Sequence, residues 1–170
     1  MKKNDTERTL EGMIHIPTLK LRLALEGVLV GLFAGGWIAL LRSCLEYVSE
    51  RRSLIVAFLQ NVSMTYAFFW VLALVVTSFV ISGLVKWVPI AGGSGIPQVR
   101  GIVIGVYSSL HWFRVIVVKL ITTALGIGAG LSMGREGPSV QIGGMAGQGI
   151  GKLFHNSNVE TRALISSGAG

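Results

Sequence analysis

The stretch GREGPSVQIGG, residues 134–144, places an arginine, a glutamate and a proline directly after one of the most apolar parts of the chain. Residues 120–133, which precede it, contain no charged side chain. A carboxylate at membrane depth is costly, and where one occurs it usually has a function. The fold and the function therefore both depend on whether this region lies in a membrane and on what Glu136 does there.

The composition is that of a membrane protein. Of the 170 residues, 51% are hydrophobic and only 14% are charged, whereas soluble domains carry about 25% charged residues. The net charge of +7 comes from scattered basic residues, without the basic patch typical of proteins that bind nucleic acid, so we expect no nucleic-acid partner. Cys44 is the only cysteine, and no spacing of side chains suggests a metal site or a catalytic pair. We therefore expect no metal, no cofactor and no enzyme activity.

The apolar segments predict an all-α, polytopic membrane protein. The polar residues 1–17 are expected to form a cytoplasmic tail, because they lack the cleavage site of a signal peptide. Long helices are expected over about 19–48, 65–88 and 111–131, and a further helix over 138–154. The segment SERR, residues 49–52, is expected to connect the first two helices.

Two sets of glycines repeat at every fourth residue and predict close helix packing: Gly27, Gly31 and Gly35, then Gly143, Gly147 and Gly151. In the long first helix, Glu26 and Arg42 are expected to be interfacial or paired. A last helix is expected after residue 157, with Ser157 or Asn158 as its N-cap.

Two glycine-rich breaks interrupt the apolar sequence, GGSGIP at residues 92–97 and GREGP at residues 134–138. Irregular backbone at membrane depth is tolerated only where it is buried in protein or lines a polar cavity. Each break has a proline where the first turn of a helix would begin. A helix N-terminus offers free N–H groups and partial positive charge, so two that converge inside the bilayer would bind an anion. The glycines would let the backbone approach the ion, and Ser94 would add a hydroxyl donor.

Glu136 would compete with an anion bound at such a site. Loss of water and nearby negative charge would both favour its protonated form, so it could act as a gate, as a proton carrier or as both. The alternative is a structural ion pair with Arg135. Neighbouring side chains at the start of a helix usually diverge, so we favour the functional role for Glu136 and a structural role for Arg135.

The motifs GGSGIPQVRG and GREGPSVQIGG, in this order, resemble those of the CLC family of chloride channels and chloride/proton exchangers. The resemblance extends over about residues 19–170. It implies broken helices, an anion path through each subunit and a homodimer of the complete protein. It also implies an anion site formed by Ser94, Gly95, Ile96, Pro97, Gly134, Arg135, Glu136 and Gly137, with Glu136 as gate and proton-transfer group. Gln98 departs from the acidic residue that many members carry there, so a nearby ion pair is expected to be absent.

The family's third anion-binding loop, its pore tyrosine and its inner proton-transfer glutamate do not occur in these residues. We therefore expect residues 18–170 to be the N-terminal part of a transmembrane transport domain that is incomplete at its C-terminus. The expected function is chloride transport across a bacterial or archaeal plasma (inner) membrane, with chloride as the bound ion. A voltage-gated-type channel and a chloride/proton antiporter both stay open. The alternative is a truncated membrane fragment that does not transport.

Overall fold

A computed structural model of the protein describes residues 17–60, 64–107 and 111–170. In these ranges the chain is helical and contains no strand, which confirms the predicted all-α class. Of the tail predicted for residues 1–17, residues 1–16 lie outside the described part of the chain. The elements are α2 (Pro17–Gln60), α3 (Met64–Trp87), a turn of 3-10 helix η1 (Pro89–Ala91), α4 (Ile96–Val103), α5 (Trp112–Gly128), α6 (Glu136–Leu153) and α7 (Asn158–Ala169).

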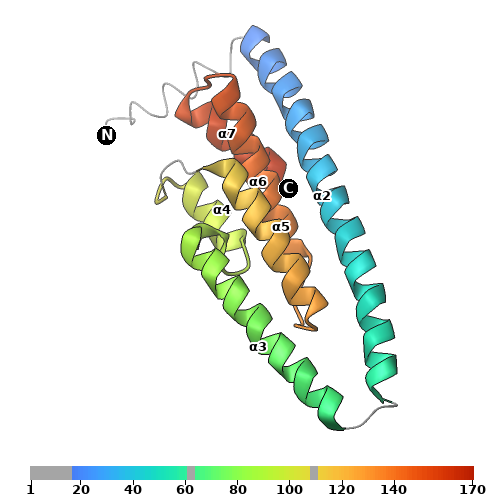
Figure 1. Cartoon of the computed structure of the whole chain (residues 1–170). Helices are drawn as coiled ribbons and strands as arrows, with labels where there is room; N and C mark the ends of the chain where they lie inside the picture. Colours follow the sequence, from blue (N-terminus) through green and yellow to red (C-terminus); the bar gives the residue numbers. More distant parts are fainter. Residues whose placement is uncertain (1–16, 61–63, 108–110) are drawn as a thin grey trace.

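The first helix, α2, is much longer than the sequence predicts. It has 44 residues and runs the full length of the molecule (Figure 1), about 66 Å at 1.5 Å per residue. The prediction that residues 49–52 form a connection is wrong, because they lie inside this helix. Serine, glutamate and arginine are all compatible with a helix, and no glycine or proline stands there to end it. Charge alone was therefore a poor signal for a helix end.

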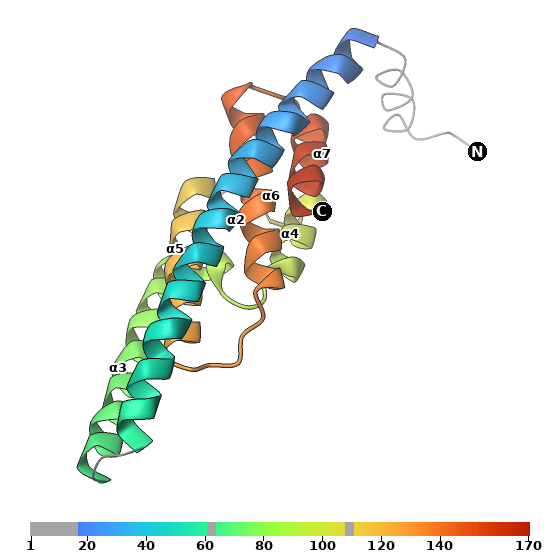
Figure 2. The same ribbon diagram turned by 90° about the vertical axis from the view of Figure 1, so that its right-hand side faces the viewer.

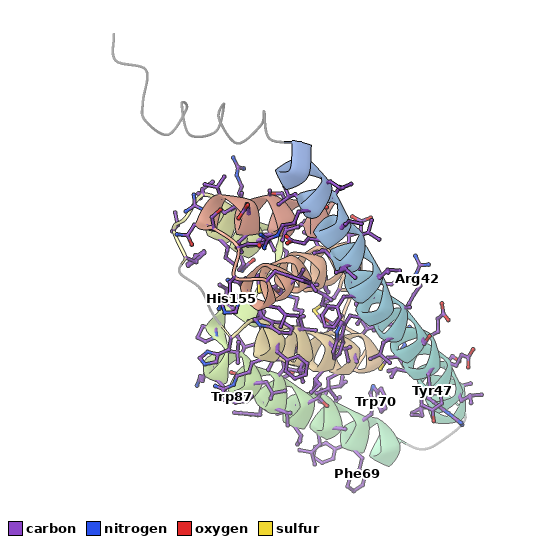
Figure 3. The ribbon with its side chains drawn as sticks, turned by 90° about the horizontal axis from the view of Figure 1, so that it is seen from above. Arg42, Tyr47, Phe69, Trp70, Trp87 and His155 are labelled. Carbon is purple, nitrogen blue, oxygen red and sulfur yellow. The ribbon has the colours of Figure 1, made fainter. Side chains whose placement is uncertain are left out.

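In the described part of the chain, two helices are long and apolar enough to cross a membrane, over Leu21–Ile55 in α2 and Phe68–Trp87 in α3. The helix α3, Met64–Trp87, matches its predicted boundaries of about 65–88 within one residue. The α3 side chains are mostly apolar and exposed around the helix, and Phe69 projects away from the other helices (Figure 3). The hydroxyl groups of Thr77 and Ser78 donate to carbonyls of their own helix, each at 2.9 Å. Such a surface suits contact with lipid.

The third predicted crossing is shorter than expected. It forms α5, which ends at Gly128 rather than near Leu131, and its 17 residues span about 26 Å. Side chains of α5 and α6 form the centre of the core, where Ile116, Ile142 and Met145 are fully buried. The helix α5 contacts α2, α3 and α6, and it therefore sits between the two long helices.

Glycines bring α6 and α7 into backbone contact, as predicted. A Cβ added at Gly147 would overlap with the carbonyl oxygen of Leu164, and one added at Gly143 would overlap with the carbonyl oxygen of Gly168. A Cβ at Gly151 would lie 2.9 Å from Thr161. No larger residue fits at these positions without separating the two helices.

The glycines of α2 behave differently. A Cβ added at Gly31 or Gly35 would meet no atom within 4 Å among the described residues, and one at Gly27 would meet only the Ser167 hydroxyl, at 3.9 Å. The prediction of a packing face there is wrong for this part of the chain. The buried face of α2 is instead formed by Glu26, Val30, Ala34, Leu41 and Leu45. Consecutive helix positions differ by about 100°, so the glycines lie beside this face.

A polar clasp fixes the N-terminal end of α2 to the turn between α6 and α7. Glu26 is 3% exposed, and its carboxylate accepts a hydrogen bond from Arg22 Nε at 2.9 Å and another from Asn156 Nδ2. Arg22 also donates to the carbonyl oxygen of Phe154 at 3.1 Å. Glu26 was predicted to be either interfacial or paired, and the structure shows it paired with Arg22. Beyond this turn Ser157 caps α7 and accepts from the Glu160 N–H, which confirms the predicted cap.

Candidate anion-binding site

The first break follows α3 and leads into α4. Pro89 follows the end of α3 and begins η1. Gly93 and Gly95 then have φ angles of 68° and 99°, a region that only glycine adopts without strain. Gly95 is the N-cap of α4, with Pro97 at the second position of the first turn. The N–H groups of this turn have no partner inside the helix and face the loop side.

The second break leads into α6, which begins earlier than predicted. Its first residue is Glu136 rather than Pro138, with Arg135 as the N-cap. Pro138 still lies in the first turn, where its missing N–H costs no helical hydrogen bond. The Arg135 carbonyl accepts from the Ser139 N–H at 3.2 Å and from its hydroxyl at 2.8 Å. The gate candidate therefore stands at the positive end of an 18-residue helix.

The two breaks meet, as their sequences predict. A Cβ added at Gly137 would overlap with the Ser94 carbonyl oxygen, and one added at Gly95 would lie 2.7 Å from the Gly137 carbonyl oxygen. The loop of residues 92–95 lies beside the start of α6 (Figure 2). This contact depends on glycine in both breaks. The N-terminal ends of α4 and α6 are thereby held next to each other.

Glu136 lies on the wall between two cavities. One, of about 440 Å³, is lined by residues of both breaks, including Ser94, Gly134, Glu136 and Gly137. The other, of about 630 Å³, is lined from α2 and the start of α6, again including Gly134 and Glu136. Of these two cavities, Arg135 lines the second. A side chain in this position can separate the two spaces or leave one for the other.

The predicted site residues are brought together, although the site is open. Ser94, Ile96, Pro97, Gly134, Arg135 and Glu136 are exposed, Gly137 is half-buried and Gly95 is buried. The loss of water predicted around Glu136 is therefore not found within the described part of the chain. Arg135 and Glu136 form no ion pair with each other in these residue ranges. A structural pair thus does not account for the glutamate.

Lys119 is a site residue that the sequence interpretation missed. It lies in the middle of α5 and is 4% exposed. Its Nζ donates to the carbonyl oxygens of Ala91 at 3.1 Å and Gly93 at 2.7 Å, and its side chain lines the cavity that contains Ser94. The missed signal was a lone lysine in an apolar helix, eight residues after the helix N-cap and too far from its end to reach the membrane surface.

Gln98 also shapes the first break. Its Oε1 accepts from the Gly95 N–H at 3.0 Å, and its Nε2 donates to the Gly92 carbonyl at 2.9 Å. The sequence interpretation noted only that an acid is missing at this position. The amide supplies both a donor and an acceptor, which a carboxylate does not.

Gln141 joins the two breaks from the side of α6. It is fully buried, and its Nε2 donates to the Ile90 carbonyl at 2.5 Å. Within the described ranges its Oε1 has no hydrogen-bond partner.

Among the described residues there is also no group of three acidic, histidine or cysteine side chains that could hold a metal ion. The donors and positive charges at the site suit a small anion.

Comparisons with known proteins identify relatives along most of the chain. A family model described as "Voltage gated chloride channel" matches residues 77–170. Proteins named H(+)/Cl(-) exchange transporter ClcA are 33% identical over 147 residues in Vibrio cholerae serotype O1 and 35% identical over 154 residues in Yersinia pseudotuberculosis serotype IB. These matches cover 84% and 86% of the chain. They cover only 31% and 30% of the two relatives, so the chain spans about a third of their length.

Proposed function

The chain belongs to the voltage gated chloride channel family, and we propose that its full-length gene product carries chloride across a membrane in exchange for protons. The observation that carries this proposal is the position of Glu136, at the N-terminus of α6 and on the wall between two cavities. An anion that approaches the helix end from either cavity meets this carboxylate. Proton-coupled exchange, rather than a passive channel, is favoured by the names of the two relatives.

In this proposal each part of the site has one task. Ser94 offers a hydroxyl donor to the ion from the cavity between the breaks, and the first turns of α4 and α6 offer backbone N–H groups and partial positive charge. Ionised Glu136 occupies the anion's place at the start of α6. Protonation removes the charge that repels the anion, and the carboxyl group then carries the proton.

The remaining functional assignments are part of the same proposal. The protein acts as a transporter and not as an enzyme, with chloride as its ligand and without a cofactor. It works as a homodimer in the plasma (inner) membrane of a bacterium or archaeon. The two apolar helices α2 and α3 support a membrane location.

Reconstitution tests the proposed function. The purified full-length gene product, in liposomes loaded with chloride, is expected to release chloride while protons move the opposite way. A chloride electrode and a pH electrode would record both movements. Chloride release without proton movement would identify a channel, and the absence of chloride release from well-folded protein would contradict the proposal.

A further inference from the structure

A further cavity, of about 430 Å³, lies at the end of α3 and does not include Glu136. Described residues of α3, η1, α4 and α5 line it, together with Tyr107. Trp87, which also lines it, is the last residue of the apolar segment Phe68–Trp87, and Figure 3 shows it at the end of α3. Tryptophan and tyrosine are enriched at the level of the lipid headgroups. We therefore expect this cavity to open at the membrane interface.

Arg114 brings an unpaired positive charge to the cavity. Its Cζ lies 5.7 Å from the centre of the Trp87 ring, and its side chain is exposed. A guanidinium group has five N–H donors, and no described residue accepts one of them or forms an ion pair with Arg114. His111 also lines the cavity, and no Asp or Glu is among its described lining residues. Because the guanidinium fork matches a phosphate group, the cavity suits a phosphate-bearing ligand.

The rest of the cavity wall is mainly apolar. Val88, Ile90 and Val115 line it beside Arg114. A soluble anion at Arg114 would leave this wall in contact with water, whereas a phospholipid would cover it with its glycerol and first acyl carbons. The apolar, exposed surface of α3 continues from the cavity along the membrane-spanning segment, so it offers a path for the acyl chains. A zwitterionic headgroup would add an ammonium group, for which the described lining supplies no carboxylate.

We propose that this cavity binds the headgroup of an anionic phospholipid, with the phosphate on Arg114 and the acyl chains along α3. Gln98 lines the same cavity and holds the first break through its bonds to Gly92 and Gly95. The bound lipid therefore rests against the element that carries the loop of the candidate anion site. This inference does not depend on the proposed function, because lipid binding is measured without transport.

Native mass spectrometry of the full-length gene product in detergent tests the inference. Phosphatidylglycerol is titrated against phosphatidylcholine with the same acyl chains, and inorganic phosphate serves as the soluble competitor. Arg114→Gln removes the charge, whereas Arg114→Lys keeps it. Arg51→Gln is the matched control, because Arg51 is likewise exposed and its Cζ lies 5.2 Å from the centre of the Tyr47 ring, on α2.

We expect the wild-type protein to bind phosphatidylglycerol about fivefold more tightly than phosphatidylcholine, and Arg114→Gln to lose this difference, because one basic residue is removed beside an anionic lipid. Arg114→Lys and Arg51→Gln are expected to stay within about twofold of wild type. Wild-type affinity for phosphatidylglycerol in Arg114→Gln would overturn the inference and would mean that another part of the protein or a second copy fills the cavity. An equal loss in Arg51→Gln would also overturn it, since overall charge would then explain the binding. Displacement by inorganic phosphate at the same concentration as the lipid would instead identify a site for a soluble anion.

Discussion

Gly137 sets how closely the two breaks approach, because the Ser94 carbonyl oxygen takes the space that a Cβ at this position would need. Gly137→Ala is expected to push the breaks apart, since a Cβ there would overlap with backbone that cannot rotate away. We expect a loss of stability at the upper end of about 1–3 kcal/mol and loss of chloride binding. Gly83→Ala in α3 is the matched control, because a Cβ there meets nothing within 4 Å and the residue lies outside the site. Thermal unfolding and chloride titration would measure both variants; equal behaviour would show that the breaks do not need this contact.

Ser94 is the side chain that we expect to discriminate between anions. It is exposed and lines the cavity between the breaks, and no described residue uses its hydroxyl. Ser94→Pro removes a compact donor suited to a spherical halide, so the chloride/nitrate flux ratio is expected to fall by severalfold. Anion-replacement flux in liposomes measures this ratio. An unchanged ratio would exclude Ser94 from selectivity.

At the residue scale, the sequence predicted the positions with a local signature and missed those whose role depends on contacts. Glu136 stood out because a charge followed an apolar segment. Lys119 was missed, because a helix that is apolar on all sides has no periodicity from which to read burial. The two hydrogen bonds of Gln98 likewise depend on the positive-φ glycines that fold the loop back onto it.

Among the elements, α2 is held at its N-terminal end by Glu26. Glu26→Ala is expected to leave Arg22 Nε and Asn156 Nδ2 without their partner and to reduce stability by about 1–3 kcal/mol, since Arg22 is half exposed and partly hydrated. Glu46→Ala, an exposed acid on the same helix, serves as the control. Thermal unfolding of the full-length gene product would compare them, and no difference between the two variants would show that the clasp does not hold α2.

Close contact between α6 and α7 depends on Gly147. Gly147→Ala places a methyl group against the Leu164 carbonyl, so the two helices must separate, at a cost of about 1–3 kcal/mol or more. Gly31→Ala on α2 has open space and is expected to be neutral or slightly stabilising, because alanine favours the helix. Thermal unfolding measures both variants, and Gly147→Ala is expected to unfold at a lower temperature than Gly31→Ala. A similar loss in both would mean that the α2 glycines also pack in the assembled protein.

At the element scale, apolar length predicted which long helices exist, and the proline in each break predicted the first turns of α4 and α6. The boundary of α2 was wrong because a charged, helix-compatible segment was taken as a connection. The equal spacing of the two glycine sets could not show which set faces a neighbour. Among the described residues, the glycines of α6 are the set in close contact with a neighbouring helix, because the short turn at residues 154–157 returns α7 along α6.

Across the whole molecule, the sequence predicted that the two breaks converge, from the chemistry of helix N-termini and from the family resemblance. It did not predict that Glu136 would line two cavities, because one of them is formed by α2, more than 80 residues earlier in the chain. The first helix is therefore part of the surroundings of the site and not only a membrane anchor.

The most direct test of Glu136 as gate and proton carrier is a simultaneous recording of chloride and proton flux from liposomes that contain the full-length Glu136→Ala variant. With the competing carboxylate removed, chloride movement is expected to continue at the wild-type rate or faster and to lose its dependence on external pH. Proton movement coupled to chloride is expected to disappear. The exposed-acid variant Glu46→Ala should retain both fluxes. Proton coupling or pH dependence retained in well-folded Glu136→Ala protein would contradict the account.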